Sequence, residues 1–147
     1  MESRLAPNDF PRLVLDANIM VSALLGKSFP FLLDLFDMGV LLLAPVQQLA
    51  ETRKKLGERP GLAQSWIDGQ MDRLIALVMP LHPALLDKHE AKARSRLGKR
   101  GQPDWPVLAA SYEANAAVWS HGKDFFGSGA PVWSTRVLRK QLEAADA

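Results

Sequence analysis

Short apolar runs alternate with segments whose apolar residues recur at helical spacing along nearly the whole chain, and this alternation limits the fold more than any other feature. Each run is continuous and apolar, as strands buried on both faces are. The expected strands cover residues 12–15, 40–43, 78–81, 117–120 and 132–133. Helices between such strands predict a parallel sheet covered on both faces, which is a three-layer α/β/α sandwich.

The helical segments are bounded by residues that commonly start or stop helices. Gly39 ends one segment, and Pro45 starts the next, which Gly57 closes. The expected helices follow residue 16, cover 29–38, begin at Pro45, cover 62–77, begin at Pro83, cover 103–116 and close the chain. In a sheet of this kind, ligands bind beyond the carboxyl ends of the strands, so the residues that follow each strand are the candidates for function.

The length and composition bound the domain count and the chemistry. The chain has 147 residues, 48% of them hydrophobic, which is enough for one core and too few for two ordinary domains. We therefore expect a single domain over residues 1–147, with residues 1–11 as a loosely ordered N-terminal tail. The absence of cysteine excludes disulfides and thiolate chemistry, so a metal would be bound by oxygen or imidazole. The sequence has no secretory signal and no apolar run of bilayer length, which predicts a cytoplasmic protein without membrane contact.

Acidic residues follow two of the expected strands. Asp16 comes directly after the first strand, and Asp124 lies in the turn after the fourth, so both are expected at the same edge of the sheet. Asp104, at the start of a later helix, is expected to face the same edge. Carboxylates brought together repel one another unless a cation neutralises them, and oxygen ligands suit Mg²⁺ or Mn²⁺. The convergence of these acids therefore favours a metal site.

Each acid also has a purely structural interpretation. Asp16 and Asp104 precede helices and are suited to cap them, which is the simpler role for either residue taken singly. Glu51 lies opposite the expected apolar face of its helix, where a solvated carboxylate is typical and a metal ligand is also tolerated. Asp124 fits as a turn residue between glycines. The expected apolar face opposite Glu51 is formed by Val46, Leu49, Ala50 and Leu56.

A basic stretch precedes Asp104. The formal net charge of +2 and the sequence pI near 9.1 permit nucleic-acid binding without requiring it. On charge alone the stretch is better interpreted as a solvated face than as a phosphate-binding surface. The residues that would contact phosphates are Lys92, Arg94, Arg96, Lys99 and Arg100.

Four segments in this order resemble the motifs of the PIN-domain nucleases. Leu13–Asn18 resembles the opening strand of that family, where the Asp binds metal and the Asn supports it. Leu49–Glu51 is similar to the segment with the second acid, and Asp104–Ala110 closely resembles the helix with the third. Ser120–Phe126 is similar to the closing motif after the fourth strand. Because the four segments extend over nearly the whole chain, the resemblance is fairly specific.

The resemblance implies a five-stranded parallel sheet and hydrolysis of RNA phosphodiester bonds by water activated on Mg²⁺ or Mn²⁺. Many family members are toxins of toxin–antitoxin pairs, so a cognate antitoxin protein is an expected partner. The basic stretch would then contact RNA. The residues implicated are Asp16, Glu51, Asp104 and Asp124 as catalytic metal ligands, with Asn18 and Ser120 as supporting residues.

One departure from the family pattern leaves alternatives open. The family usually has Thr, any residue and then Asp in the closing motif, whereas this chain has Ser120 and Gly122, so one acid is missing. A PIN-fold protein that has lost cleavage and binds RNA or an antitoxin is therefore the alternative function. An aspartyl-phosphate enzyme or receiver that uses Asp16 is less favoured, because Asn18 stands where the common phosphatase pattern has a second Asp.

Oligomeric state is not fixed by the sequence. Trp66, Met71 and Leu74 recur at helical spacing and would serve a homodimer interface as readily as a core. Burial in the core is the preferred interpretation of these residues.

Overall fold

The computed structural model describes residues 12–146, and its centre is a five-stranded sheet in the order β3-β2-β1-β4-β5. All four strand pairs are parallel. The strands are β1 (Arg12–Leu15), β2 (Leu41–Pro45), β3 (Val78–Leu81), β4 (Ala117–Trp119) and β5 (Val132–Trp133). The predicted α/β fold with a parallel sheet is confirmed, while the expectation for residues 1–11 lies outside the described residues.

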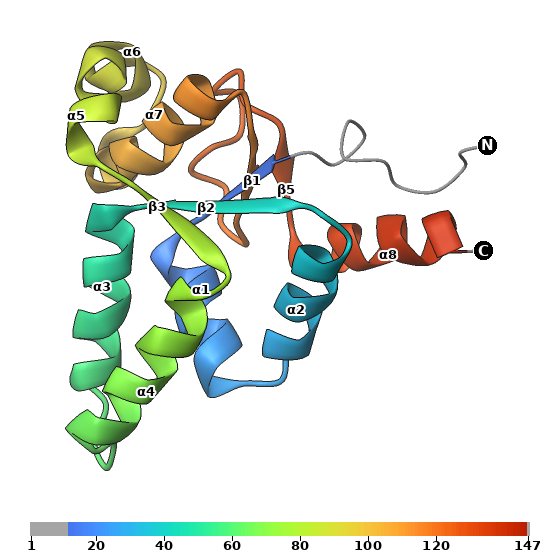
Figure 1. Cartoon of the computed structure of the whole chain (residues 1–147). Coiled ribbons are helices and arrows are strands. Elements are labelled where there is room, and N and C mark those ends of the chain that lie inside the picture. The colour runs from blue at the N-terminus through green and yellow to red at the C-terminus, as the bar shows by residue number, and fades with distance from the viewer. Residues whose placement is uncertain (1–11, 147) are drawn as a thin grey trace.

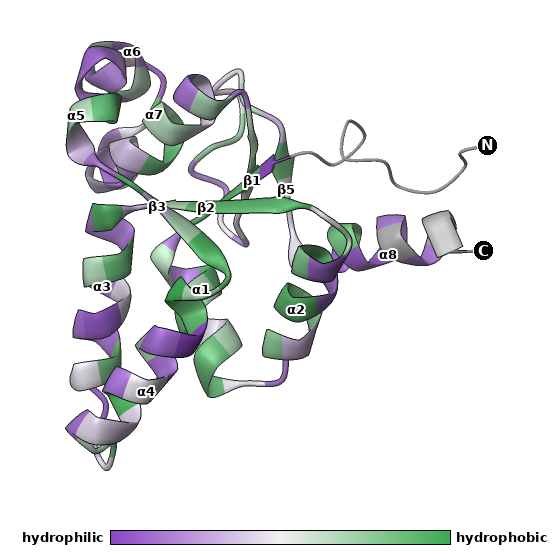
Figure 2. Ribbon diagram, viewed as in Figure 1, coloured by the Kyte–Doolittle hydropathy of each residue, from purple (hydrophilic) through white to green (hydrophobic). Residues whose placement is uncertain are grey.

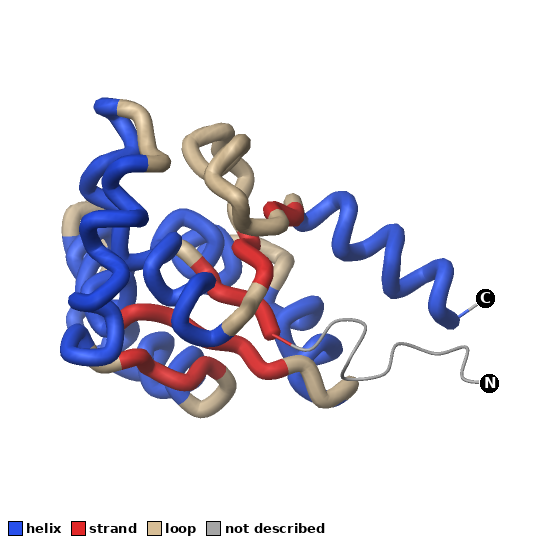
Figure 3. The backbone as a smooth tube through the Cα atoms, turned by 90° about the horizontal axis from the view of Figure 1, so that it is seen from above, coloured by secondary structure: helices blue, strands red, loops and turns tan. Residues whose placement is uncertain are grey.

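Helices cover the sheet on two sides, as the alternation of elements predicts (Figures 1 and 3). On one side lie α1 (Ala17–Leu25), α2 (Phe29–Asp37), α3 (Val46–Gly57) and α4 (Gln64–Ile75). On the other side lie α5 (Pro83–Leu86), α6 (Glu90–Ser95) and α7 (Trp105–Ala114), with the 3₁₀ turns η1 (Asp87–His89) and η2 (Lys99–Asp104). The last helix, α8 (Thr135–Asp146), extends outward from the body beyond α2.

Successive strand residues point to opposite faces and so build two separate cores. Leu13 and Leu15 of β1 pack with α1 to α4, while Val14 between them packs with α5 to α7. Leu42 and Leu43 of β2 divide in the same way. Figure 2 shows the apolar character of β2 against the mixed faces of the covering helices. Burial on both faces is the reason that these strands are continuous apolar runs.

The order of the strands places the ends of β1 and β4 next to each other. Leu15 pairs with Trp119, so the residues that follow them, Asp16 and Ser120, emerge side by side. On its other flank, β1 pairs with β2, whose last residue, Pro45, leads directly into α3. The chain leaves β2 and β4 towards opposite sides of the sheet, and this reversal makes the end of β1 the natural place for a site.

The buried face of α3 differs from the predicted one. Val46 and Ala50 were expected inside, but both are exposed, whereas Gln48 and Thr52 are buried. These polar side chains are buried because their hydrogen bonds are satisfied. The Gln48 side-chain oxygen accepts from the Ala17 N–H at 2.7 Å, and the Thr52 hydroxyl donates to the Gln48 carbonyl oxygen at 2.8 Å. The rotation brings Glu51 to the edge of a pocket rather than to the far side of the helix.

The helix expected over residues 103–116 is divided. Its first residues, Pro103 and Asp104, belong to the 3₁₀ turn η2, and the α-helix α7 begins only at Trp105. At the other end, Asn115 has a φ of 51°, a left-handed conformation that terminates α7. Asp104 therefore lies at the junction of two kinds of helix, which determines the direction of its side chain.

No single described helix is long and apolar enough to cross a bilayer. The pair α1 and α2 meets the criterion only when the two helices, bent by 111° to each other, are counted together. Most of the apolar side chains of this pair belong to the core described above.

The three residues considered for a dimer interface lie on α4. Met71 and Leu74 are buried in the core, as preferred from the sequence, while Trp66 is 38% exposed. A homodimer stays a prediction.

Candidate metal and nucleic-acid site

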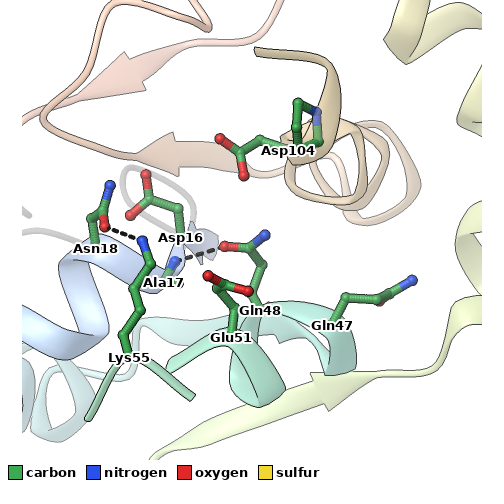
Figure 4. A pocket seen from close by; sticks show the side chains of 9 residues that line it. Asp16, Ala17, Asn18, Gln47, Gln48, Glu51, Lys55 and Asp104 are labelled. Carbon is green, nitrogen blue, oxygen red and sulfur yellow. Dashed lines mark hydrogen bonds between the residues drawn. The ribbon is translucent and has the colours of Figure 1, made fainter. Parts of the chain in front are cut away.

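A pocket of about 240 Å³ lies where the ends of β1 and β2 meet the start of α1, the first turns of α3 and the η2 turn (Figure 4). Its lining contains three carboxylates and one ammonium group, from Asp16, Glu51, Asp104 and Lys55. The other lining residues are Ala17, Asn18, Gln47, Gln48 and Pro103. Three of the four predicted metal ligands thus share this pocket.

Asp16 is the most buried of these acids, with 7% of its surface exposed. One carboxylate oxygen accepts from the Ile19 N–H at 2.9 Å, so Asp16 does cap α1. The other oxygen accepts from the Ser120 hydroxyl at 2.8 Å across the β1–β4 pair. Burial raises the pKa of Asp16, although both hydrogen bonds act in the opposite direction. Both partners are neutral, so this charge has no bonded cation among the described residues.

Asp104 faces Asp16 across the pocket (Figure 4). It precedes α7, but its side chain makes no capping hydrogen bond, so the capping interpretation does not account for it. Burial is the main cause that raises the pKa of Asp104, and repulsion from Asp16 adds to it. The Gln48 side-chain amide forms a hydrogen bond with Asp104, which opposes the rise only in part. The two acids are held in a position where they destabilise each other's charge.

Gln48 fixes the geometry between these elements. Its side-chain oxygen accepts from the Ala17 N–H, and its amide group reaches Asp104, so it ties α1, α3 and η2 together. Glu51 lies one turn further along α3 and is partly buried at the same pocket. Nothing in the sequence patterns marked Gln48, because a polar residue at a buried helical position has no distinctive signal before its partners are known.

Lys55 places a positive charge at the edge of the acid pocket. Its ammonium group donates to the side-chain oxygen of Asn18 at 2.7 Å, so that α3 and α1 are linked (Figure 4). The Lys55 charge lowers the pKa of both Asp16 and Asp104, though less than burial raises them. Lys55 follows two other basic residues, Arg53 and Lys54, and belongs to none of the four acid motifs, so the motifs did not mark it. A useful signal was its spacing of four residues from Glu51, which puts both on one helical face.

Asp124 differs from the other three predicted ligands. It does not line the pocket, and its carboxylate forms an ion pair with the Arg100 guanidinium at 2.9 Å. The Gly101 backbone lies against it, with 3.2 Å between the Asp124 Cβ and the place of a Cβ on residue 101. Asp124 still contributes to the rise in the pKa of Asp104. Its role as a metal ligand stays a prediction and would require Arg100 to release its carboxylate.

The residues of the basic stretch are all exposed, but several are already engaged. Arg94 donates to Glu90 at 2.7 Å, and Arg100 pairs with Asp124. The Lys92 ammonium lies 4.1 Å from the centre of the Tyr112 ring. Arg96 makes a long contact of 3.5 Å with the Ser128 carbonyl oxygen, and Lys99 lies at the start of η2, the turn that ends at Asp104. None of the five basic residues lines the acid pocket, but Lys99 and Arg100 belong to the same turn as Asp104, which does.

The donor set of the pocket fits a hard divalent cation that keeps part of its water. Among residues 12–146, no three acidic or histidine side chains are close enough together to hold one ion directly. Mg²⁺ in proteins commonly keeps several waters and takes one or two carboxylates. Asp16, which is buried, and Asp104, which is half-buried on the opposite wall, meet that requirement, and Glu51 shares the pocket. The pocket offers oxygen donors and excess negative charge, as such an ion needs.

Comparison with known families gives one match over most of the chain. The model of the PIN domain matches residues 14–143, which include all four acids and both supporting residues named above. No curated protein matches the chain at a significant level.

Solved structures with the same fold include three protein complexes. VapBC2 from Rickettsia felis, bound to a DNA fragment from its promoter, has a chain that aligns with a TM-score of 0.68 and 15% identity, over 84% of this chain and 98% of that one. FitAB bound to an IR36 DNA fragment gives 0.58 and 15%, with coverages of 83% and 94%. FitAcB from Neisseria gonorrhoeae gives 0.54 and 16%, with 82% and 96%. At these identities the likeness shows the shared fold.

Proposed function

Because the chain belongs to the PIN-domain family, we propose that it is an endoribonuclease that hydrolyses RNA phosphodiester bonds with Mg²⁺ or Mn²⁺ bound in the pocket of Asp16, Glu51 and Asp104. The observation that carries the proposal is the state of Asp104. Its carboxylate caps no helix and faces Asp16, and its pKa is raised by burial and by the Asp16 charge. A fold maintains two such acids against their repulsion at a cost, and a divalent cation would offset it.

The proposed roles follow from the contacts of each residue. Asp16 and Asp104 would hold the ion, with Glu51 as a direct or water-mediated ligand. Ser120 donates a hydrogen bond to Asp16 and would keep one oxygen of that carboxylate oriented. Asn18 supports the site from the first turn of α1, where its side-chain oxygen holds Lys55. When bound, the ion would supply a Lewis acid for the scissile phosphate and lower the pKa of a coordinated water.

RNA would reach the pocket along the basic stretch. Lys92, Arg96 and Lys99 have no carboxylate partner among the described residues, whereas Arg94 and Arg100 do. Phosphate contacts release counterions, so each lost contact flattens the dependence of log K on log salt by roughly 0.7 for single-stranded RNA. Replacing Lys92, Arg96 and Lys99 with Ala should flatten this slope more than replacing the paired Arg94 and Arg100. Equal slopes for both variants and the wild type would mean that the basic stretch is a solvated surface that does not contact RNA.

We also propose that the protein is the toxin of a toxin–antitoxin pair and binds a cognate antitoxin protein. This proposal rests on the family resemblance and on the structural neighbours VapBC2, FitAB and FitAcB, the first two of which are bound to DNA fragments. A cytoplasmic location is proposed with it. Co-expression with the product of an adjacent open reading frame tests this role, and relief of growth inhibition by that product is the expected result.

A PIN-fold binding module without cleavage remains the second candidate function. Two observations favour it: Gly122 stands where the family usually has an acid, and Asp124 is already paired with Arg100. Incubation of the purified protein with labelled single-stranded and structured RNA, in Mg²⁺, Mn²⁺ or EDTA, separates the two functions. Cleavage in either metal and none in EDTA is expected. Binding without cleavage in any metal would favour the module.

A further inference from the structure

We propose that Lys55 is a built-in cation of the acid pocket, which limits the site to one divalent ion and weakens the binding of that ion. The proposal deepens the proposed function and rests on it, because it assumes that the pocket binds a metal. It concerns a residue outside the acid motifs and assigns to it the control of metal affinity and stoichiometry.

The position of Lys55 is the first step. A lysine four residues after a glutamate on an exposed helix is well placed to pair with that glutamate. Lys55 instead donates to the Asn18 side-chain oxygen at 2.7 Å, and no ion pair with Glu51 is formed among residues 12–146. Asn18 belongs to the first turn of α1, which begins directly after Asp16. The ammonium group is therefore fixed across the gap between α3 and α1, on the Asp16 side of the pocket (Figure 4).

The charge of Lys55 acts on both walls of the pocket. It lowers the pKa of Asp16 and also that of Asp104, which belongs to a different element. Arg53 is paired with Asp68 on α4, and Lys54, in the same last turn of α3 as Lys55, does not line the pocket. Of this basic cluster, only Lys55 is directed towards the acids.

The formal charges of the lining residues then set the capacity of the site. With Asp16, Glu51 and Asp104 ionised and Lys55 protonated, two negative charges remain uncompensated, which is the charge of one divalent ion. A second ion would have to bind to a site already neutral and beside an ammonium group. The positive charge of Lys55 thus substitutes for the charge of the second metal ion in two-metal sites.

The test compares Mn²⁺ binding by calorimetry for the wild type, Lys55→Met and Lys54→Met. Lys54→Met removes the same charge from the same helical turn and so matches any effect on the helix dipole. The wild type should bind one Mn²⁺ per chain. Lys55→Met should bind Mn²⁺ about tenfold more tightly or take up a second ion, because a like charge has been removed. Lys54→Met should resemble the wild type.

A second set of variants keeps the test independent of one substitution. Lys55→Gln also removes the charge, and Lys55→Arg retains it, so the first should follow Lys55→Met and the second the wild type. Melting in EDTA adds a readout without metal: the charge-removing variants should melt lower than Lys54→Met, and Mn²⁺ should raise their melting temperature more.

The outcomes separate the inference from the proposed function. Equal Mn²⁺ affinity and stoichiometry for the wild type and both charge-removing variants would overturn the role of Lys55 and leave the metal site in place. Two ions bound by the wild type would overturn the proposed limit. Tighter binding by Lys55→Met without cleavage of any RNA would support the inference while the proposed ribonuclease function fails. No Mn²⁺ binding by any variant would overturn both.

Discussion

Asp16 and Asp124 both follow a strand at the carboxyl edge of the sheet, yet the fold treats their charges in opposite ways. Asp16 is buried with two neutral hydrogen-bond donors, the Ile19 N–H and the Ser120 hydroxyl, and burial raises its pKa. Asp124 is accompanied by Arg100, at 2.9 Å. An acid left without a cation is available to a metal, whereas a paired acid must first lose its partner. A position after a strand therefore tells where an acid lies but not whether it is free.

Asp104 belongs with Asp16 in this comparison, although it precedes a helix rather than following a strand. Its pKa is raised by burial and by Asp16, and it takes no part in capping α7. The pocket acids thus carry unbalanced charge, and the acid in the loop after β4 does not.

Asp104→Asn should reduce metal-dependent RNA cleavage by roughly 10³-fold or more, since it removes a proposed ligand while keeping the shape of the side chain. Single-turnover cleavage of labelled RNA in Mn²⁺ measures the effect. Asp72→Asn, the same change on the exposed surface of α4, is the matched control and should leave cleavage unchanged. Full activity of the Asp104 variant would remove Asp104 from the site.

Gly122→Asp should tighten Mn²⁺ binding by about tenfold, because it gives the loop after β4 an acid without a partner. The Gly122 N–H donates to the Ser120 hydroxyl oxygen, which itself donates to Asp16, so the new carboxylate would lie near the pocket. Gly122 does not have a left-handed φ, and its nearest neighbour for an added Cβ is 3.8 Å away, so the substitution brings no backbone strain.

Calorimetric titration with Mn²⁺ measures the affinity of the Gly122→Asp variant and of the wild type. Gly69→Asp adds the same charge on α4, where an added Cβ meets nothing within 4 Å, and serves as the control. Unchanged affinity in a folded Gly122→Asp variant would show that the loop does not face the metal.

Asp124→Ala should weaken Mn²⁺ binding by only about twofold to threefold, because an exposed ion pair contributes below about 1 kcal/mol and the acid is not free for the ion. Arg100→Ala, which leaves Asp124 without its partner, should instead strengthen Mn²⁺ binding slightly. Equilibrium titration of both variants with Mn²⁺ measures these changes in affinity. A loss with Asp124→Ala as large as that with Asp104→Asn would make Asp124 a full ligand and erase the contrast between the two regions.

The raised pKa values predict a small pH effect on the stability of the metal-free protein. In the unfolded chain the pKa of an Asp side chain is near 3.9, and in the folded protein burial raises the pKa of Asp104. The folded protein therefore binds the Asp104 proton more tightly than the unfolded chain does. The free energy of unfolding falls as pH rises from the unfolded-state pKa of Asp104 through its folded-state pKa. Asp104→Asn removes this contribution and should raise the melting temperature in EDTA at neutral pH by about 2 °C.

Thermal melts of wild type and variant in EDTA, from neutral pH down to about pH 4, measure this difference. The gap should narrow toward the acid end, as protonation of the wild-type carboxyl removes its charge. The comparison is needed because Asp68 and Glu113, whose pKa values are lowered by Arg53 and His89, change stability in the opposite direction. A gap that is constant with pH would mean that the Asp104 charge is not destabilising.

The sequence predicted the sheet well, since the apolar run Leu13–Leu15 of β1 reports burial on both faces, a property of the residues themselves. The rotation of α3 could not be predicted, because Gln48 and Thr52 are buried only through hydrogen bonds with partners whose positions depend on the whole fold. The error at Val46 and Ala50 followed from ranking positions by hydrophobicity alone.

The site was predicted as a set of acids, and the structure places Asp16, Glu51 and Asp104 around one pocket. Motif spacing identifies such acids because they sit at fixed places relative to strands and helices. Motif spacing does not identify the basic side chains near these acids. Lys55 is bonded to Asn18, 37 residues away in sequence, and Arg100 is bonded to Asp124, 24 residues away.

Mn²⁺ broadening of backbone amide signals in NMR spectra of the wild-type protein shows whether the metal binds between Asp16 and Asp104. At substoichiometric Mn²⁺, the signals of Ala17, Gln48, Glu51 and Asp104 should broaden first, and Asp104→Asn should suppress this effect. Broadening that begins instead around Lys123 and Asp124, or equally at exposed acids such as Asp34 and Asp72, would contradict metal binding between Asp16 and Asp104.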